Sequence, residues 1–247
     1  MRVRASLTPM PAIVRDIAVS EVDRGEVLRY LGYRGQELTP QLAGRLDELV
    51  AHALEVARPR ASIRSFDVEA RELDDAGTPV VRLRGCALAL AGHDVSRHLE
   101  RAVAVGLLAV TLGADTEREL RRLSLTDHVA QVVFDAALTA IVERAADGAE
   151  ALLVADAASR GLYTNWRYSP GYGDLPLSCQ PTFLAVLDAG RRLGITLTPS
   201  LLMVPTKSVT ALVGYFGEPQ VGARTGCATC NLRDWCTLRA RGVTCVG

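Results

Sequence analysis

The stretch Arg167-Tyr168-Ser169-Pro170-Gly171-Tyr172-Gly173-Asp174 lies between a long helical segment and a shorter one. It contains an arginine, two tyrosines, an acid and a Pro-Gly turn within eight residues. Proline fixes φ, and glycine lets the backbone come close to a ligand. Arginine presents a planar set of donors to a carboxylate, and tyrosine offers a stacking face with one hydroxyl. The stretch therefore suits a small ligand that carries a carboxylate and a flat ring; an ordinary Pro-Gly surface turn is the alternative.

On both sides of this stretch, the spacing of apolar residues predicts an irregular mixture of helices and strands. The predicted helices cover 20–30, 40–58, 94–102, a segment from 115 onward, 127–159 and 181–193, and the predicted strands cover 63–70, 80–83, 103–111 and 208–216. The segment 103–111 is apolar on both faces, which is typical of a central strand. Irregular alternation favours an α+β fold over a doubly wound sheet.

Local signals refine these elements. Ser20 and Thr39 are expected N-caps, and Phe66, Val68 and Ala70 are expected to face inward from a strand. The helix 127–159 carries an apolar stripe rich in small residues: Val129, Val132, Val133, Ala136, Ala137, Ala140 and Ile141. Asp135 and Glu143 lie two turns apart on it; most helical acids are solvated, but Glu143 follows an apolar pair and could face a cleft.

Composition narrows the class of protein. The 247 residues contain 28 Lys+Arg and 28 Asp+Glu, so no charge excess indicates nucleic acid or an acidic membrane as a partner. No segment reaches the ~20 apolar residues of a membrane span, and Pro9 and Pro11 interrupt any signal-peptide core. We therefore expect a cytoplasmic protein whose six cysteines are not disulfide-bonded. The expected division is a main domain over 1–225 and a cysteine-rich tail over 226–247.

Two motifs resemble a known family. Arg167 to Tyr172 resembles the Arg-x-x-Pro-Gly-Tyr motif of the activation domain of cobalamin-dependent methionine synthase, and 205–211 resembles its Pro-x-x-Ser-Val-Ser-Gly motif. Thr111-Leu112-Gly113 and the helix with Asp135 and Glu143 are similar to stand-alone bacterial versions. The resemblance covers about residues 20–220, with both motifs in the family's order.

The resemblance implies a twisted antiparallel sheet flanked by helices, with S-adenosylmethionine in a shallow groove. Arg167 would bind the methionine carboxylate, Tyr172 would lie at the same ligand, and Gly171 would offer backbone contacts. Glu143 matches the family's helix acid to within about one residue, and Ser208 belongs to the motif that would line the groove. The activity implied is reductive remethylation of cob(II)alamin by S-adenosylmethionine, as an activation subunit of a methyltransferase.

The chain departs from the full-length enzyme because it shows no cobalamin-binding motif and no folate or homocysteine module. The resemblance therefore implies an accessory protein acting in trans on a methionine synthase or another corrinoid protein, with an electron donor such as flavodoxin or ferredoxin. Two alternatives stay open: a non-catalytic docking module for a cobalamin domain, and an iron–sulfur reductive activase of a different corrinoid methyltransferase.

The cysteine-rich tail needs an explanation of its own. Cys227, Cys230, Cys236 and Cys245 are separated by two, five and eight residues. Two thiolates at Cys-x-x-Cys spacing can hold one metal ion, but a structural zinc site often has two such pairs, whereas an iron–sulfur cluster tolerates irregular spacing. A 4Fe-4S cluster, zinc, and metal-free redox-active thiols are the alternatives. Cys179 is either an extra ligand or a buried thiol.

Overall fold

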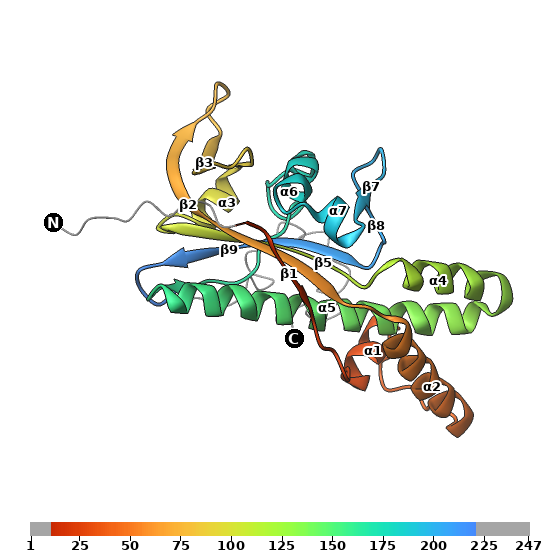
Figure 1. Ribbon diagram of the computed structural model, residues 1–247. Helices are drawn as coiled ribbons and strands as arrows, with labels where there is room; N and C mark the ends of the chain where they lie inside the picture. The colour runs from red at the N-terminus through yellow and green to blue at the C-terminus, as the bar shows by residue number, and fades with distance from the viewer. Residues whose placement is uncertain (1–10, 221–247) are drawn as a thin grey trace.

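The computed structural model describes residues 11–220 as one curved antiparallel sheet with helices on both faces (Figure 1). The strands lie in the order β4-β3-β2-β5-β9-β6, and β1 pairs with the first half of β2. A separate hairpin pairs β7 with β8. The strands are β1 (Ile13–Asp16), β2 (Arg60–Leu73), β3 (Pro79–Leu83), β4 (Ala89–Ala91), β5 (Ala104–Thr111), β6 (Tyr163–Thr164), β7 (Thr196–Leu197), β8 (Met203–Val204) and β9 (Ser208–Phe216).

The helices form two layers. A long helix, α5, runs under one face of the sheet with α1, α2 and α4 beside it, and α3, α6 and α7 cover the opposite face (Figure 1). The helices are α1 (Arg24–Tyr30), α2 (Pro40–Val56), α3 (His93–His98), α4 (Ala114–Thr126), α5 (His128–Ser159), the single 3₁₀ turn η1 (Leu177–Cys179), α6 (Gln180–Val186) and α7 (Ala189–Leu193). The expected α+β class with a twisted antiparallel sheet is thus confirmed. No helix within residues 11–220 is long and apolar enough to cross a bilayer.

The central strands contribute side chains to two hydrophobic cores, one on each face of the sheet. All eight residues of β5 are buried, as expected for a strand that is apolar on both faces. Alternate side chains point to opposite faces, so Leu108 packs against α5 while Leu107 packs under α6 and α7. The same alternation holds in β2, where Phe66 and Val68 face one core as expected and Ile63 faces the α5 core.

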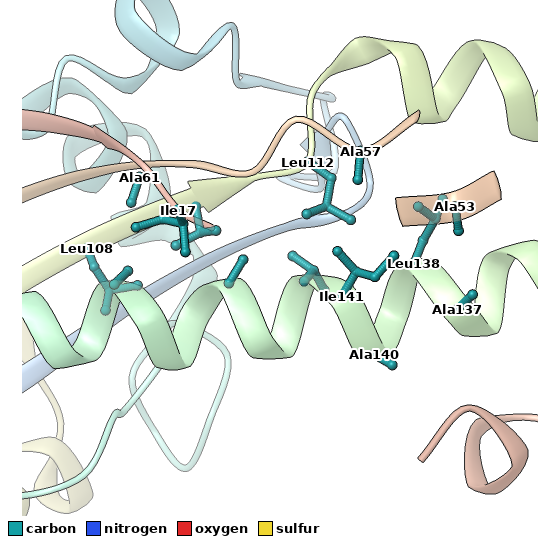
Figure 2. Close-up of a cluster of buried hydrophobic side chains, with 14 of the residues drawn as sticks. Ile17, Ala53, Ala57, Ala61, Leu108, Leu112, Ala137, Leu138, Ala140 and Ile141 are labelled. Atoms are coloured by element: carbon teal, nitrogen blue, oxygen red, sulfur yellow. The ribbon is translucent and has the colours of Figure 1, made fainter. Parts of the chain in front are cut away.

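Small residues let neighbouring elements pack closely around α5. Ala137, Ala140, Ala145 and Ala149 are fully buried, and Figure 2 shows part of the buried cluster around this helix. Asp127 caps the helix by accepting a hydrogen bond from the Ala130 N–H at 2.9 Å. The predicted stripe is wrong at its beginning, because Val129 and Val132 are each 57% exposed. The first turns of α5 extend past the strands, so fewer of their faces are covered (Figure 1).

Other boundaries depend on side-chain capping. The first helix begins at Arg24 with Asp23 as its N-cap, not at Ser20, whereas Thr39 caps α2 as expected. The predicted helix 181–193 is broken between α6 and α7, where the Leu187 carbonyl accepts a hydrogen bond from the Ser62 hydroxyl at 2.7 Å. Asp188 then takes a left-handed conformation with φ of 52°. A partner 125 residues away in the sequence therefore ends this helix.

The helix predicted over 94–102 is shorter than expected and ends at His98. The Arg71 guanidinium on β2 donates to the Leu99 carbonyl at 2.8 Å and to the Ala102 carbonyl at 2.6 Å. Carbonyls at the end of a helix lack intrahelical donors, and a side chain from another element can satisfy them. The Arg71 side chain therefore fixes the turn that leads from α3 into β5.

Candidate functional site

The segment after α5 places Arg167 at the edge of the sheet. Residues 163–168 follow β9 in the antiparallel sense: β6 pairs with β9, and the Tyr168 backbone exchanges hydrogen bonds with Leu212 at 2.9 and 2.8 Å. Between them, the Asn165 side chain accepts from the Gly214 N–H at 2.8 Å. Because extended backbone alternates its side chains, Trp166 and Tyr168 turn toward α3 while Arg167 turns toward α5.

On the α5 side, Arg167 lies among three carboxylates, and its side chain is only 15% exposed. Its Nη2 lies 2.9 Å from an Asp147 oxygen and 3.4 Å from a Glu143 oxygen, and its Nε lies 3.4 Å from a Glu150 oxygen. The three acids occupy positions i, i+4 and i+7 of α5, a spacing that puts them on one helix face. The structure therefore brings together Arg167 and Glu143, two residues that the sequence named separately as candidates for the same ligand.

The Arg167 cluster, meaning Arg167 with Glu143, Asp147 and Glu150, has donor and acceptor capacity left for a ligand. The Arg167 Nη1 atom is buried and has no hydrogen-bond partner among the described residues. A buried donor without a partner reduces the stability of the folded protein by about 1–3 kcal/mol, so native proteins rarely keep one without a functional reason. Glu143 and Asp147 keep 45% and 43% of their side chains exposed. The cluster can thus receive an anion at the guanidinium and a cation at the carboxylates.

The rest of the motif packs against α3 instead. The Gly171 N–H donates to the Leu175 carbonyl at 2.8 Å, and the Tyr168 hydroxyl donates to the Tyr172 carbonyl at 3.0 Å. Asp174 accepts hydrogen bonds from the first N–H groups of α3. The N–H of Gly171 is therefore occupied within the turn, while Tyr172 remains 69% exposed beside it.

Ser208 lies inside the sheet rather than beside Arg167. Its residue is 8% exposed, its hydroxyl donates to the Pro205 carbonyl at 2.8 Å, and the Thr111 hydroxyl lies 2.9 Å away. Ser208 pairs with Thr111 at the start of β9, four residues before the bridge between Leu212 and Tyr168. The structure therefore brings Glu143 to Arg167, but it does not bring the Ser208 hydroxyl there.

Three site residues were missed by sequence reasoning. Asp147 and Glu150 could have been found from their helical spacing to Glu143. The third is Lys207, the only lysine in the sequence, whose Nζ lies 2.9 Å from an Asp135 oxygen and 2.8 Å from the Thr139 hydroxyl. Asp135 and Thr139 lie on the same polar face of α5 as Glu143. Lys207, which directly precedes β9, therefore links the start of that strand to α5.

Burial changes the acid–base properties of the groups that support the site. Burial lowers the pKa of His98 to about 4, and the ring contacts Trp166 edge-on and Tyr168 at a tilt of 38°. Burial, assisted by Asp94 and Asp174, raises the pKa of Tyr168 to about 12. His98 and Tyr168 are therefore neutral at pH 7.

The described residues offer no metal site. Within 11–220, no group of three or more His, Cys, Asp or Glu side chains is arranged to hold a metal ion. Burial raises the pKa of the Cys179 thiol to about 11, which agrees with a protonated thiol packed against the core. Cys227, Cys230, Cys236 and Cys245, and with them the domain boundary at 225/226, lie outside the described residues.

The Arg167 cluster does not line either of two shallow grooves found elsewhere on the surface. One lies between β2, β3 and the flank of α3, and the other lies between the end of α2 and α4. The second is bordered by arginines that are already bonded to nearby carboxylates or carbonyls: Arg58, Arg118 and Arg122. The Arg167 cluster is therefore the candidate site because of its charged side chains and its buried nitrogen without a partner among the described residues, and not because of a surface groove.

Comparison with known proteins agrees with the motifs. Residues 89–223 match the family described as the activation domain of vitamin B12 dependent methionine synthase. The chain belongs to this family. That region includes α5, the Arg167 motif and β9. No curated protein matches the sequence.

A solved structure shows that the fold is also that of the activation domain. The structure described as the MetH reactivation domain bound to AdoHcy aligns with 95% of this chain and 87% of its own chain, with a TM-score of 0.56. Its sequence identity to this chain is 17%, so the likeness concerns the fold. The mixed architecture expected from the sequence is thereby confirmed for this member of the activation-domain family.

Proposed function

We propose that this activation domain binds S-adenosylmethionine at the Arg167 cluster and supports the reductive remethylation of cobalamin. The observation that carries the proposal is the buried Arg167 Nη1, which has no partner among the described residues although three carboxylates surround the same guanidinium. The AdoHcy ligand of the solved relative supports the choice of ligand class.

The chemistry of the cluster is complementary to the charges of this ligand. The guanidinium would bind the methionine carboxylate, because charge-assisted pairs with carboxylates are strong and directional. The Glu143 and Asp147 carboxylates would accept the ammonium group and offset the positive sulfonium. After methyl transfer the sulfonium becomes a neutral thioether, so an acid-rich site favours the methyl donor over its product.

The proposed reaction has two steps, a reduction and a methyl transfer. One electron reduces cob(II)alamin on the partner to cob(I)alamin, whose cobalt then attacks the S-methyl group. The carbon–sulfur bond breaks, its electron pair stays on sulfur, and methylcobalamin and S-adenosylhomocysteine form. The contribution of the activation domain is positioning of the donor beside the cobalt, which acts as an effective concentration.

We further propose that the protein acts in trans on a cobalamin-dependent methionine synthase or another corrinoid protein, with a flavodoxin or ferredoxin as electron donor. Tyr172 is proposed to lie at the same ligand, and the 205–211 segment is proposed to line the groove that faces the partner through residues other than the buried Ser208. Docking would be transient, because the same cobalt must also face its other substrates.

Ligand binding is tested by titration calorimetry with S-adenosylmethionine on the wild type and on Arg167→Ala. The variant should bind at least about 30-fold more weakly, which corresponds to ~2 kcal/mol for a lost charge-assisted pair. Arg144→Ala is the matched control, because Arg144 is an exposed arginine on α5, the helix that carries the three carboxylates of the cluster. Equal affinities for the wild type and Arg167→Ala would remove Arg167 from the site.

The reaction is tested by mixing the protein with a separate cob(II)alamin-loaded corrinoid protein, S-adenosylmethionine and a low-potential reductant. The absorption change to methylcobalamin should require S-adenosylmethionine, and a labelled methyl group should appear on cobalt. Reactivation at the same rate without S-adenosylmethionine would favour a reductive activase. Tight docking without methyl transfer would favour a non-catalytic module.

We also propose, from the sequence alone, that the tail cysteines Cys227, Cys230, Cys236 and Cys245 hold an iron–sulfur cluster. Their irregular spacing and the need for an electron in the reaction support a cluster over zinc. Anaerobically purified protein should contain iron and sulfide and absorb in the visible range, and Cys227→Ser should lose both. Stoichiometric zinc without iron would contradict the redox role and leave a structural one.

A further inference from the structure

An aromatic side chain lies at the end of α1, on the outer side of α5. Tyr30 is the last residue of α1 and stays 37% exposed despite its large ring. The Arg29 guanidinium lies 4.5 Å from the centre of that ring. A ring that is held by a cation but still exposed can stack against a flat ligand group.

The packing of α1 against α5 brings Tyr30 toward the Arg167 cluster. Val27, one turn before Tyr30, is fully buried and belongs to the same core as Ala140 of α5. Ala140 is fully buried although it lies on the side of α5 away from the strands, where α1 runs (Figure 2). Glu143 follows Ala140 by three positions and is therefore its neighbour on the helix surface. Glu143 thus lies at the border between the α1 contact and the Arg167 cluster.

The electrostatics of Tyr30 agree with this placement. Burial raises the pKa of the Tyr30 phenol, Arg29 opposes the rise, and the Glu143 carboxylate adds to it. The charge of Glu143 therefore acts on the phenol, while its carboxylate lies 3.4 Å from Arg167 Nη2. Glu143 therefore pairs with the Arg167 guanidinium and also acts electrostatically on the Tyr30 phenol.

We propose that Tyr30 is a specificity-determining residue that stacks on the nucleoside base of an S-adenosyl ligand held at the Arg167 cluster. This inference rests on the proposed function. With the amino-acid end held by Arg167, Glu143 and Asp147, the base must lie farther along the ligand. Tyr30 provides the flat surface on the α1 side, so α1 selects ligands with a base over simple amino acids.

The test is titration calorimetry of Tyr30→Ala, Tyr30→Leu and Tyr30→Phe with S-adenosylmethionine and with S-adenosylhomocysteine. Loss of the ring should weaken both ligands alike, by roughly 5- to 100-fold, the range for stacking of one base. Tyr30→Phe should stay within about twofold of the wild type, because it keeps the stacking face. Tyr30→Leu keeps a large apolar side chain with good helix propensity, which preserves the α1 packing if Tyr30→Ala does not fold.

Tyr163→Ala is the matched control, because Tyr163 is an exposed tyrosine on β6 at 49% and should leave both affinities unchanged. Unchanged affinity in folded Tyr30→Leu, while Arg167→Ala still loses binding, would overturn the role of Tyr30 alone. A loss confined to S-adenosylmethionine would also overturn it, since the ring would then face the sulfonium. A wild type that binds neither ligand would overturn the proposed function itself.

Discussion

The two faces of the sheet use polar residues in different ways. On the α5 face, charged side chains form ion pairs: Arg167 pairs with three carboxylates, and Lys207 pairs with Asp135. On the α3 face, the buried His98 ring is neutral and Asp174 caps α3. One motif supplies both faces, because extended backbone sends Arg167 and Tyr168 in opposite directions. The motif therefore contains both the residue proposed to bind the ligand, Arg167, and residues that anchor the turn to α3.

Two of the cations on the α5 face have different roles. Lys207 is satisfied by Asp135 and the Thr139 hydroxyl, whereas Arg167 keeps one buried nitrogen without a partner among the described residues. We therefore expect Lys207 to clamp the start of β9 to α5 and Arg167 to bind. The experiments below test both differences and are ordered by decreasing size of the predicted change.

Gly173→Ala should destabilise the protein by about 3 kcal/mol, since a Cβ there would overlap the Tyr168 hydroxyl and the Asp94 carboxylate at a φ of 51°. Gly161→Ala is the matched control: its φ is 69°, but nothing lies within 4 Å of the added Cβ, so only about 1 kcal/mol should be lost. Denaturant unfolding measures both. A loss of ligand affinity without any loss of stability would contradict an architectural role for Gly173.

Acid should weaken the α3 face before the α5 face. The folded protein favours neutral His98, whose pKa falls from 6.5 to about 4, so the unfolded chain takes up a proton first as the pH decreases. Stability is then complete above about pH 6.5 and decreases toward pH 4, by at most about 2 kcal/mol between pH 7 and 5.

Urea unfolding of the wild type and His98→Gln at pH 7 and pH 5 checks this dependence. The variant should lose most of the change between the two pH values. Carboxylates add little in this window; Glu119, for example, has its pKa lowered to about 2 by hydrogen bonds from Arg122 and His52. An equal pH dependence in the variant would show that another group is responsible.

Asp147→Asn should weaken S-adenosylmethionine binding about 10-fold, or ~1.4 kcal/mol, because the amide no longer attracts an ammonium or sulfonium. The comparison is Asp135→Asn on the same helix, whose carboxylate pairs with Lys207 and should leave the affinity within about twofold. Calorimetry at one ionic strength measures both variants. Equal losses would show that the ligand extends along α5 to Asp135.

Lys207→Met should reduce the free energy of unfolding by about 1 kcal/mol, since Asp135 is half exposed and can be solvated by water. Lys207→Arg should restore little, because the two acceptors converge on one ammonium that is only 13% exposed. Thermal and urea unfolding give the change in stability. A large loss of ligand affinity in Lys207→Met would remove the distinction between the two cations.

Much of the layout follows from local patterns in the chain. The limits of α5, the burial of β5 on both faces and the Thr39 cap of α2 follow from periodicity and capping chemistry. The break between α6 and α7 does not, because its cause is a Ser62 hydroxyl from a distant strand. Likewise, the exposure of Val129 and Val132 depends on how far α5 extends past the sheet.

The candidate site divides in the same way. The motif, the family and the candidate residues Arg167 and Glu143 can be named from the sequence, because side-chain chemistry and helical spacing are local properties. The fold alone settles that Glu143, Asp147 and Glu150 meet the guanidinium, that Ser208 faces inward, and that the charge of Glu143 acts on the Tyr30 phenol. Those facts depend on the packing of α1 and β9 against α5, and contacts between distant segments are set by the whole fold.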